Sequence, residues 1–211
     1  MNSLGTADSC SPISFLFFLI FLLPLITSCT REFQPKPLGY NRIMLPEPSY
    51  RQSPDSLPYS FSYSTHALLL DDTSWVSEKY WIEIYYPELK ANIHITYKTI
   101  KSEAQLRELI EDAFTLTAKH QIKANAIDEV VITTPSGNRA VIAEVSGEVP
   151  SQFQFTMTDS TSNFLRGAVY FFTKVNNDSL GPAIDYVKKD AVHLINSLRW
   201  KNEPPATKTR D

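Results

Sequence analysis

The amino-acid sequence predicts an α+β fold: a mainly antiparallel sheet of about five to seven strands with two packed helices, one mid-chain and one C-terminal. Two observations predict it. Segments with the alternating pattern of strands outnumber segments with helical periodicity, and most of them follow one another directly along the chain. The chain has 211 residues, of which 43% are hydrophobic, which suffices for one ordinary domain plus a targeting segment. We therefore expect a single domain over residues 59–201.

The predicted domain opens with three strand segments. The first begins at residue 59, where aromatic residues alternate with serines, and continues toward residue 70. The second and third are residues 80–86 and 92–100, in which isoleucine and tyrosine recur at every second position. Residues 87–90 form the turn between them, so we expect an antiparallel hairpin.

The mid-chain helix is predicted to follow this hairpin. Ser102 and Gln105 have the spacing of a capping box, in which each side chain satisfies a backbone N–H of the first turn. The helix is expected to end near residues 120–123, where cationic side chains suit the negative end of the helix dipole. Its apolar stripe at helical spacing consists of Leu106, Leu109, Ile110, Ala113 and Thr117.

Four further strand segments separate this helix from the second one. They are residues 129–134, 139–149, 153–158 and 165–173, and the last is aromatic and β-branched enough to be a central strand. The C-terminal helix is expected over residues 182–199, because Pro182 suits an early helical position and one apolar stripe follows it.

Residues 1–28 are predicted to be a lipoprotein signal peptide. The apolar run from Ile13 to Ile26, roughly 14 residues, is shorter than the about 20 that a bilayer span needs and has the length of a signal-peptide h-region. Small residues then precede Cys29, so we expect cleavage before Cys29 and attachment of lipid, including palmitate, to it. The segment before the apolar run departs from the usual pattern, because it has no Lys or Arg and contains Asp8.

The cysteine content agrees with a lipid anchor. The only other cysteine, Cys10, would be removed with the signal, so the mature chain keeps one cysteine at its first position. A buried free cysteine and an uncleaved membrane anchor are the alternatives. Residues 29–58 are rich in proline and are predicted to be a lipidated N-terminus and semi-rigid tether that partly packs on the domain, whereas residues 202–211 form a polar tail.

Charge and motifs exclude several functions. The chain has 20 Lys+Arg and 23 Asp+Glu with no long block of one sign, whereas nucleic-acid binding needs a clustered basic face. It has no glycine-rich phosphate loop, no histidine pair at metal spacing and no G-x-S-x-G elbow, so we expect no catalytic residue, no cofactor and no metal. The histidines are scattered and are expected to be structural, with His94 on the strand face opposite Ile93 and Ile95. They are His66, His94, His120 and His193.

The densest polar cluster is the candidate interaction surface. It consists of Gln152, Thr158, Asp159, Ser160, Asn163 and Arg166. The favoured interpretation is a turn in which Asp159 and Ser160 satisfy local backbone amides; a protein-binding loop and a catalytic site are the alternatives. Because a cation at the start of an apolar strand needs a partner, we expect Arg166 to pair with Asp159.

Three tripeptides have the Asp-Ser/Thr-apolar type of pattern used for O-glycosylation of exported proteins in some bacteria. They begin at Asp55, Asp159 and Asp178. Ser56, in the predicted tether, is the most accessible candidate for a glycan.

An ordered series of short blocks extends over essentially the whole mature chain. The blocks are Pro35–Ile43 with Leu45–Pro46, Pro58–Phe61, Tyr85–Pro87, Lys119–His120 with Ala124–Ile127, Gln152–Phe153, Thr158–Ser160, Asn163–Gly167 with Tyr170–Phe171, Asn177–Ser179 and Leu198–Trp200. In these blocks and their order the chain resembles the GldD family of gliding-motility lipoproteins.

This resemblance implies a non-enzymatic, lipid-anchored component of the cell-envelope machinery that moves adhesins over the surface and is linked to type IX secretion. Its expected partners are other gliding and type IX secretion proteins of the envelope. Thr30 after Cys29 is not an acidic retention signal, which favours the outer membrane over the inner one. Two alternatives are an envelope hydrolase or ligand-binding lipoprotein that uses Asp159, Ser160 and Arg166 with a histidine such as His120, and a passive structural lipoprotein.

Overall fold

The computed structural model describes residues 44–119, 124–172 and 177–201, without the side chains of residues 177–179. The predicted signal peptide, Cys29 and part of the predicted tether lie outside the described residues, as do His120 and the predicted tail. None of the helices in the described part of the chain is long and apolar enough to cross a membrane.

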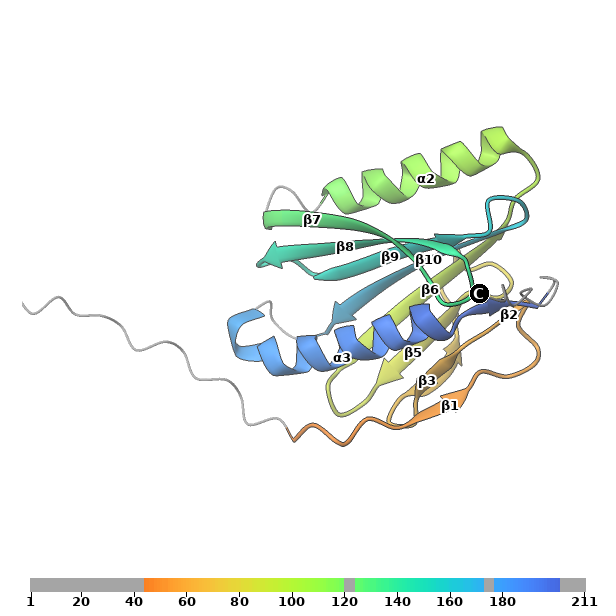
Figure 1. Ribbon diagram of the computed structural model, residues 1–211. Coiled ribbons are helices and arrows are strands. Elements are labelled where there is room, and N and C mark those ends of the chain that lie inside the picture. The colour runs from red at the N-terminus through yellow and green to blue at the C-terminus, as the bar shows by residue number, and fades with distance from the viewer. Residues whose placement is uncertain (1–43, 120–123, 173–176, 202–211) are drawn as a thin grey trace, which may run out of the picture. The chain divides into compact units, whose positions relative to one another are not determined.

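The centre of the domain is a seven-stranded sheet in which every neighbouring pair of strands is antiparallel (Figure 1). In spatial order its strands are β4 (Leu68–Asp71), β5 (Ile82–Tyr86), β6 (Ala91–Thr99), β10 (Asn163–Phe171), β9 (Phe153–Thr158), β8 (Arg139–Gly147) and β7 (Ala124–Thr133). The predicted hairpin is confirmed, because β5 pairs with β6 and places Ile82 opposite Ile95. β10 lies at the centre of the sheet, as its composition predicts.

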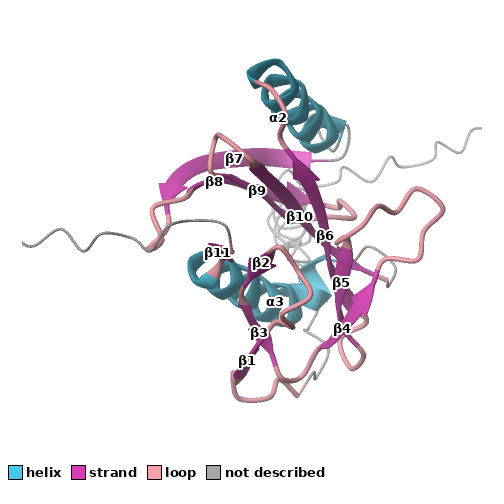
Figure 2. Cartoon of the chain, turned by 90° about the vertical axis from the view of Figure 1, so that its right-hand side faces the viewer, coloured by secondary structure: helices cyan, strands magenta, loops and turns pink. Residues whose placement is uncertain are grey.

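The main core lies between the sheet and the C-terminal helix, α3 (Asn177–Ser197). Figure 2 shows α3 on the concave side of the sheet, together with the short strands β1 (Tyr50–Gln52), β2 (Tyr59–Ser60), β3 (Ser62–Ser64) and β11 (Arg199–Trp200). Ile84, Phe155 and Leu194 are completely or almost completely buried in this core. The helix begins earlier than expected, so that Pro182 lies inside it rather than near its start.

The mid-chain helix, α2 (Glu103–Ala118), lies on the other face of the sheet. Its predicted start is confirmed, because the Ser102 side chain accepts a hydrogen bond from the backbone N–H of Gln105 at 3.2 Å. The expected end at residues 120–123 lies outside the described residues, and α2 itself ends at Ala118. Both long helices flank a mostly antiparallel sheet, so the predicted α+β class is confirmed.

The N-terminal part of the domain differs from the expectation in its first strand, and some residues of the predicted tether pack on it. The predicted strand from residue 59 to residue 70 is divided into β2, β3 and β4, because these three segments pair with different partners: β11, β1 and β5. In addition, β1 lies within the residues assigned to the tether. It is fixed to the domain through Tyr50, whose hydroxyl donates to the buried carboxylate of Asp190 at 2.9 Å.

Candidate functional site

The turn between β9 and β10 is organised by one carboxylate. Oδ1 of Asp159 accepts hydrogen bonds from the backbone N–H groups of Thr161, Ser162 and Asn163 at 2.8–2.9 Å. Oδ2 accepts from the side-chain amide of Asn163 at 2.6 Å. Burial would raise the pKa of this carboxyl, but the hydrogen bonds outweigh burial and hold its pKa below the ordinary value. The predicted turn is therefore confirmed for the Asp159 side chain, whereas the Ser160 side chain forms no hydrogen bond with a backbone amide in the described part of the chain.

The other polar residues of the cluster have separate surroundings. Ser160 is exposed, with a positive φ of 65°, and its backbone N–H donates to Thr158 Oγ1. Asn163 is buried and its Oδ1 accepts from the hydroxyl of Tyr97 at 2.6 Å. Gln152 is buried before β9, and its Nε2 donates to the carbonyl of Val149 at 2.7 Å.

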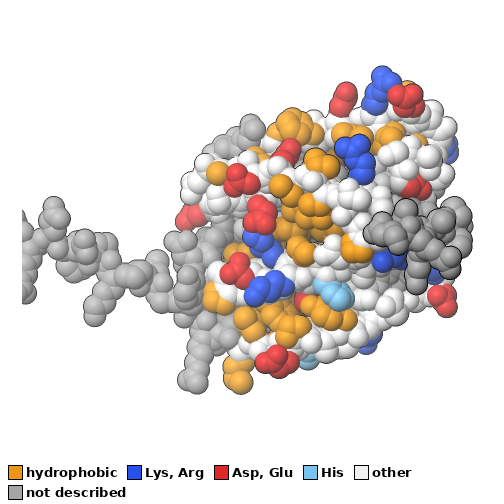
Figure 3. Space-filling view, viewed as in Figure 1, with side chains coloured by type: hydrophobic (Ala, Val, Ile, Leu, Met, Phe, Trp, Pro, Cys, Tyr) orange, Lys and Arg blue, Asp and Glu red, His pale blue; other side chains and the backbone are white. Residues whose placement is uncertain are grey.

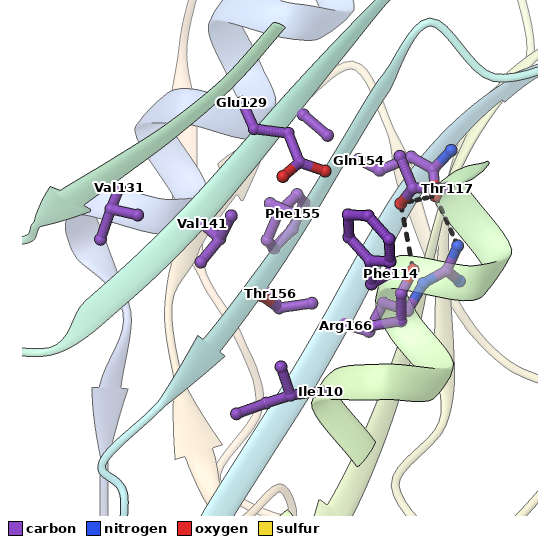
Figure 4. Close-up of a pocket in the computed structure, with 12 residues that line it drawn as sticks. Ile110, Phe114, Thr117, Glu129, Val131, Val141, Gln154, Phe155, Thr156 and Arg166 are labelled. Carbon is purple, nitrogen blue, oxygen red and sulfur yellow. Dashed lines mark hydrogen bonds between the residues drawn. The ribbon is translucent and has the colours of Figure 1, made fainter. Parts of the chain in front are cut away.

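Arg166 does not pair with Asp159, so that expectation is wrong. Its Nη2 donates instead to Oε1 of Gln154 at 2.6 Å, on the face of the sheet that α2 covers. The same oxygen accepts from Thr117 Oγ1 of α2 at 3.3 Å (Figure 4). The pair fails to form because the turn amides already occupy the Asp159 carboxylate, and strand alternation directs Arg166 toward α2.

Arg166 lines a groove of about 270 Å³ between α2 and the sheet. The groove is mostly apolar, and Figure 4 shows side chains from α2, β7, β8, β9 and β10 around it. Its lining residues include Ile110, Phe114, Val131, Val141, Gln154 and Arg166. Asp159, Ser160 and Asn163 do not line it. His120, which a catalytic arrangement would need, lies outside the described residues.

The groove exists because α2 covers its half of the sheet incompletely. Ala113 and Thr117 are buried against the sheet, whereas Ile110 and Phe114 are 49% and 59% exposed. On β7, which is an edge strand, Val131 faces the groove and is 60% exposed. Sequence reasoning missed this site, although the consecutive apolar residues at 130–132 indicate a strand that is apolar on both faces.

Two polar groups at the groove have incomplete partners. Nε2 of Gln154 is buried and has no hydrogen-bond partner within the described part of the protein. Arg166 belongs to none of the ion pairs found among the described residues. A buried unsatisfied donor costs roughly 1–3 kcal/mol. The groove therefore presents mostly apolar walls, the carboxylate of Glu129, and the guanidinium of Arg166 as a donor suited to a carboxylate or carbonyl oxygen.

Hydrophobic side chains also reach the surface on the opposite face of the molecule. Figure 3 shows several such groups between charged side chains on the α3 side. Val130 is 55% exposed on this α3 side, because its neighbour on β7, Val131, faces the groove on the other side. The exposure of apolar side chains alone therefore does not distinguish the groove face of the sheet from the α3 face.

Elsewhere in the described part, Ser56 is exposed between β1 and β2, and its glycosylation stays a prediction. Among the described residues, one group of side chains has metal-ligating atoms close together. It consists of Asp72, Glu83 and His94 on the half of the sheet that α2 leaves uncovered.

Comparison with known proteins identifies the family. The family model of the gliding motility lipoprotein GldD matches residues 30–200. No match was found among curated proteins. The solution structure of cyanobacterial PsbP (CyanoP) from Synechocystis sp. PCC 6803 is similar at 12% identity and a TM-score of 0.44, covering 78% of this chain and 99% of that one. That likeness is too low to carry an argument. Because the family model covers most of the chain, the protein belongs to the GldD family of gliding motility lipoproteins.

Proposed function

We propose that the protein is a non-enzymatic component of the gliding machinery associated with type IX secretion, and that it acts through contacts with other envelope proteins. Family membership supports the gliding role. The signal pattern supports removal of residues 1–28 and lipidation of Cys29, including palmitate. Thr30 supports an anchor in the outer membrane, because it is not an acidic retention signal.

The observation that carries the contact role is the groove between α2 and β7–β10. It exposes Phe114 and Val131 and places Arg166, without an acidic partner among the described residues, beside them. Exposed apolar side chains next to a few polar groups are typical of protein-binding surfaces. The occupant that fits is an apolar segment of a partner protein that carries a carboxylate for Arg166.

The test uses two neighbouring valines on β7 as a matched pair. Val131→Asp should abolish colony spreading and lower type IX export, because a carboxylate in the groove is costly to bury and repels the carboxylate of the partner. Val130→Asp introduces the same charge on the other face of the same strand and should leave both functions unchanged. A photo-crosslinking residue at position 131, but not at position 130, should join the protein to a component of the machinery in intact cells.

Three outcomes would count against the proposal. Normal spreading and export after deletion of the gene would remove the proposed function itself. Normal function of Val131→Asp, with the deletion strain defective, would remove the groove as the contact surface. Crosslinking of position 131 to a lipid or a small molecule alone would replace the protein partner with that ligand.

A further inference from the structure

A group of metal-ligating side chains lies on the half of the sheet that α2 does not cover. Glu83 of β5 stands directly opposite His94 of β6. Asp72 follows β4, and its backbone N–H donates to the carbonyl of Trp81, the residue before β5. Strand alternation directs the three side chains to one face. One ligand atom from each lies within 4.8 Å of the other two.

The two carboxylates have few cations to neutralise them. The side chain of Asp72 is only 2% exposed, and its Oδ2 lies 2.8 Å from Nε2 of His94. Neither Asp72 nor Glu83 forms an ion pair with a Lys or Arg in the described part of the chain; the nearby Lys98 pairs with Glu78. Such a pair of acidic groups beside an imidazole attracts a divalent cation.

The fixed geometry of Asp72 also favours a ligand. Its Oδ1 accepts the backbone N–H of Ser74 at 2.8 Å, which orients the carboxylate and leaves Oδ2 for the site. Such an outer hydrogen bond is the kind that positions metal ligands in proteins.

The distances between the ligand atoms of these three residues require only small movements of their side chains to bind a metal ion. Zinc–ligand bonds of about 2.0–2.2 Å in tetrahedral geometry separate two ligand atoms by roughly 3.3 Å. The Nε2–Oδ2 distance of 2.8 Å would have to widen by about half an ångström, and the partly buried Glu83 would approach by rotation of its side chain. The metal would take the place of the Nε2 proton, which requires the neutral His94 ring with its proton on Nδ1.

We propose that Asp72, Glu83 and His94 bind a divalent transition-metal cation, for which Zn²⁺ fits best, and leave a fourth coordination position for water or a partner. The imidazole selects a transition metal over Ca²⁺ or Mg²⁺, which prefer six or more oxygen ligands or octahedral water. The site is independent of the groove and of the proposed function. It would hold the end of β4 and the following residues, which include the 96% exposed Trp75, against β5 and β6.

The test is metal titration of the whole chain purified in detergent and stripped with a chelator. Zn²⁺ should bind with one equivalent by calorimetry and raise the melting temperature, because only the folded chain assembles the ligands. Co²⁺ should give the visible absorption of a low-coordinate site. Ca²⁺ and Mg²⁺ should do neither at the same concentration.

Two variants and a matched control separate binding from folding. His94→Gln can still donate a hydrogen bond to Asp72 but is a poor ligand, so it should weaken Zn²⁺ binding by more than the roughly 10–100-fold that outer-shell changes cost. Glu83→Gln should weaken binding without unfolding the protein. His66→Ala removes an exposed histidine elsewhere and should bind as the wild type does. Equal affinity of His94→Gln and wild type, or no binding to the wild type, would reduce Asp72 and His94 to an internal ion pair and overturn the proposal.

Discussion

At the scale of single residues, Asp159 shows how local chemistry decides a site. Sequence reasoning correctly assigns its carboxylate to turn amides, because Asp followed by small polar residues is typical of such turns. The same reasoning wrongly pairs it with Arg166. The short distance in sequence between two residues does not show how many acceptor positions of a carboxylate remain free. In the structure, backbone amides of the turn and the side chain of Asn163 occupy those of Asp159.

Loss of the Asp159 charge should destabilise the protein in a pH-dependent manner. Its carboxyl has a lower pKa in the folded chain than the ordinary 3.8, so its stabilising contribution is present above that value and is lost as the pH falls through the folded-state pKa. Asp159→Asn should lower the free energy of unfolding by about 1 kcal/mol at pH 7. The difference from wild type should disappear in strong acid, as measured by urea denaturation.

The control for this measurement is Asp112→Asn on α2. The side chain of Asp112 is exposed and makes no hydrogen bond or ion pair among the described residues, so the change should stay within about 0.5 kcal/mol at every pH. An Asp159→Asn effect that is equal at neutral and acidic pH would show that the hydrogen bonds do not depend on the charge.

At the scale of elements, periodicity predicts the strands and helices well but does not predict what covers them. The capping box and apolar stripe locate α2 correctly, yet Ile110 and Phe114 of that stripe remain exposed. Periodicity identifies the apolar face of a helix, whereas the area it buries depends on how far the helix lies across a sheet assembled from distant segments. Sequence reasoning also missed the group of Asp72, Glu83 and His94, because the pairing of β4 with β5 and of β5 with β6 brings these residues together from separate segments.

The contact of β9 with β10 depends on a glycine. A Cβ atom on Gly167 would lie 2.2 Å from Cζ of Phe155, which stands opposite it on β9. Because the ring is almost completely buried, it has little space to move. Gly167→Ala should therefore lower the free energy of unfolding by at least about 1–3 kcal/mol, the usual cost of overpacking.

A double-mutant cycle tests this explanation. In a Phe155→Leu background the ring is absent, so Gly167→Ala should cost less than it does in wild type, as chemical denaturation can measure. If Gly167→Ala lowered the free energy of unfolding equally in both backgrounds, Phe155 would not be the cause of the strain.

At the scale of the whole molecule, the fold class, the helix order and the family all follow from the sequence. The partner of the tether residue Tyr50 does not follow from the sequence, because Tyr50 lies in a proline-rich segment and reaches Asp190 on α3, far away in the chain. The domain combines a closed core around α3 with an incompletely covered second face. We propose that this second face binds proteins of the envelope machinery, and that the lipid on Cys29 holds the domain at the membrane.

The most direct measurement of this proposal replaces the chromosomal gene with Cys29→Ser. The account predicts that the domain still folds, carries no lipid, is lost from the outer-membrane fraction, and no longer supports gliding or type IX export. A Cys29→Ser protein that stays membrane-bound and restores full motility and export would contradict it.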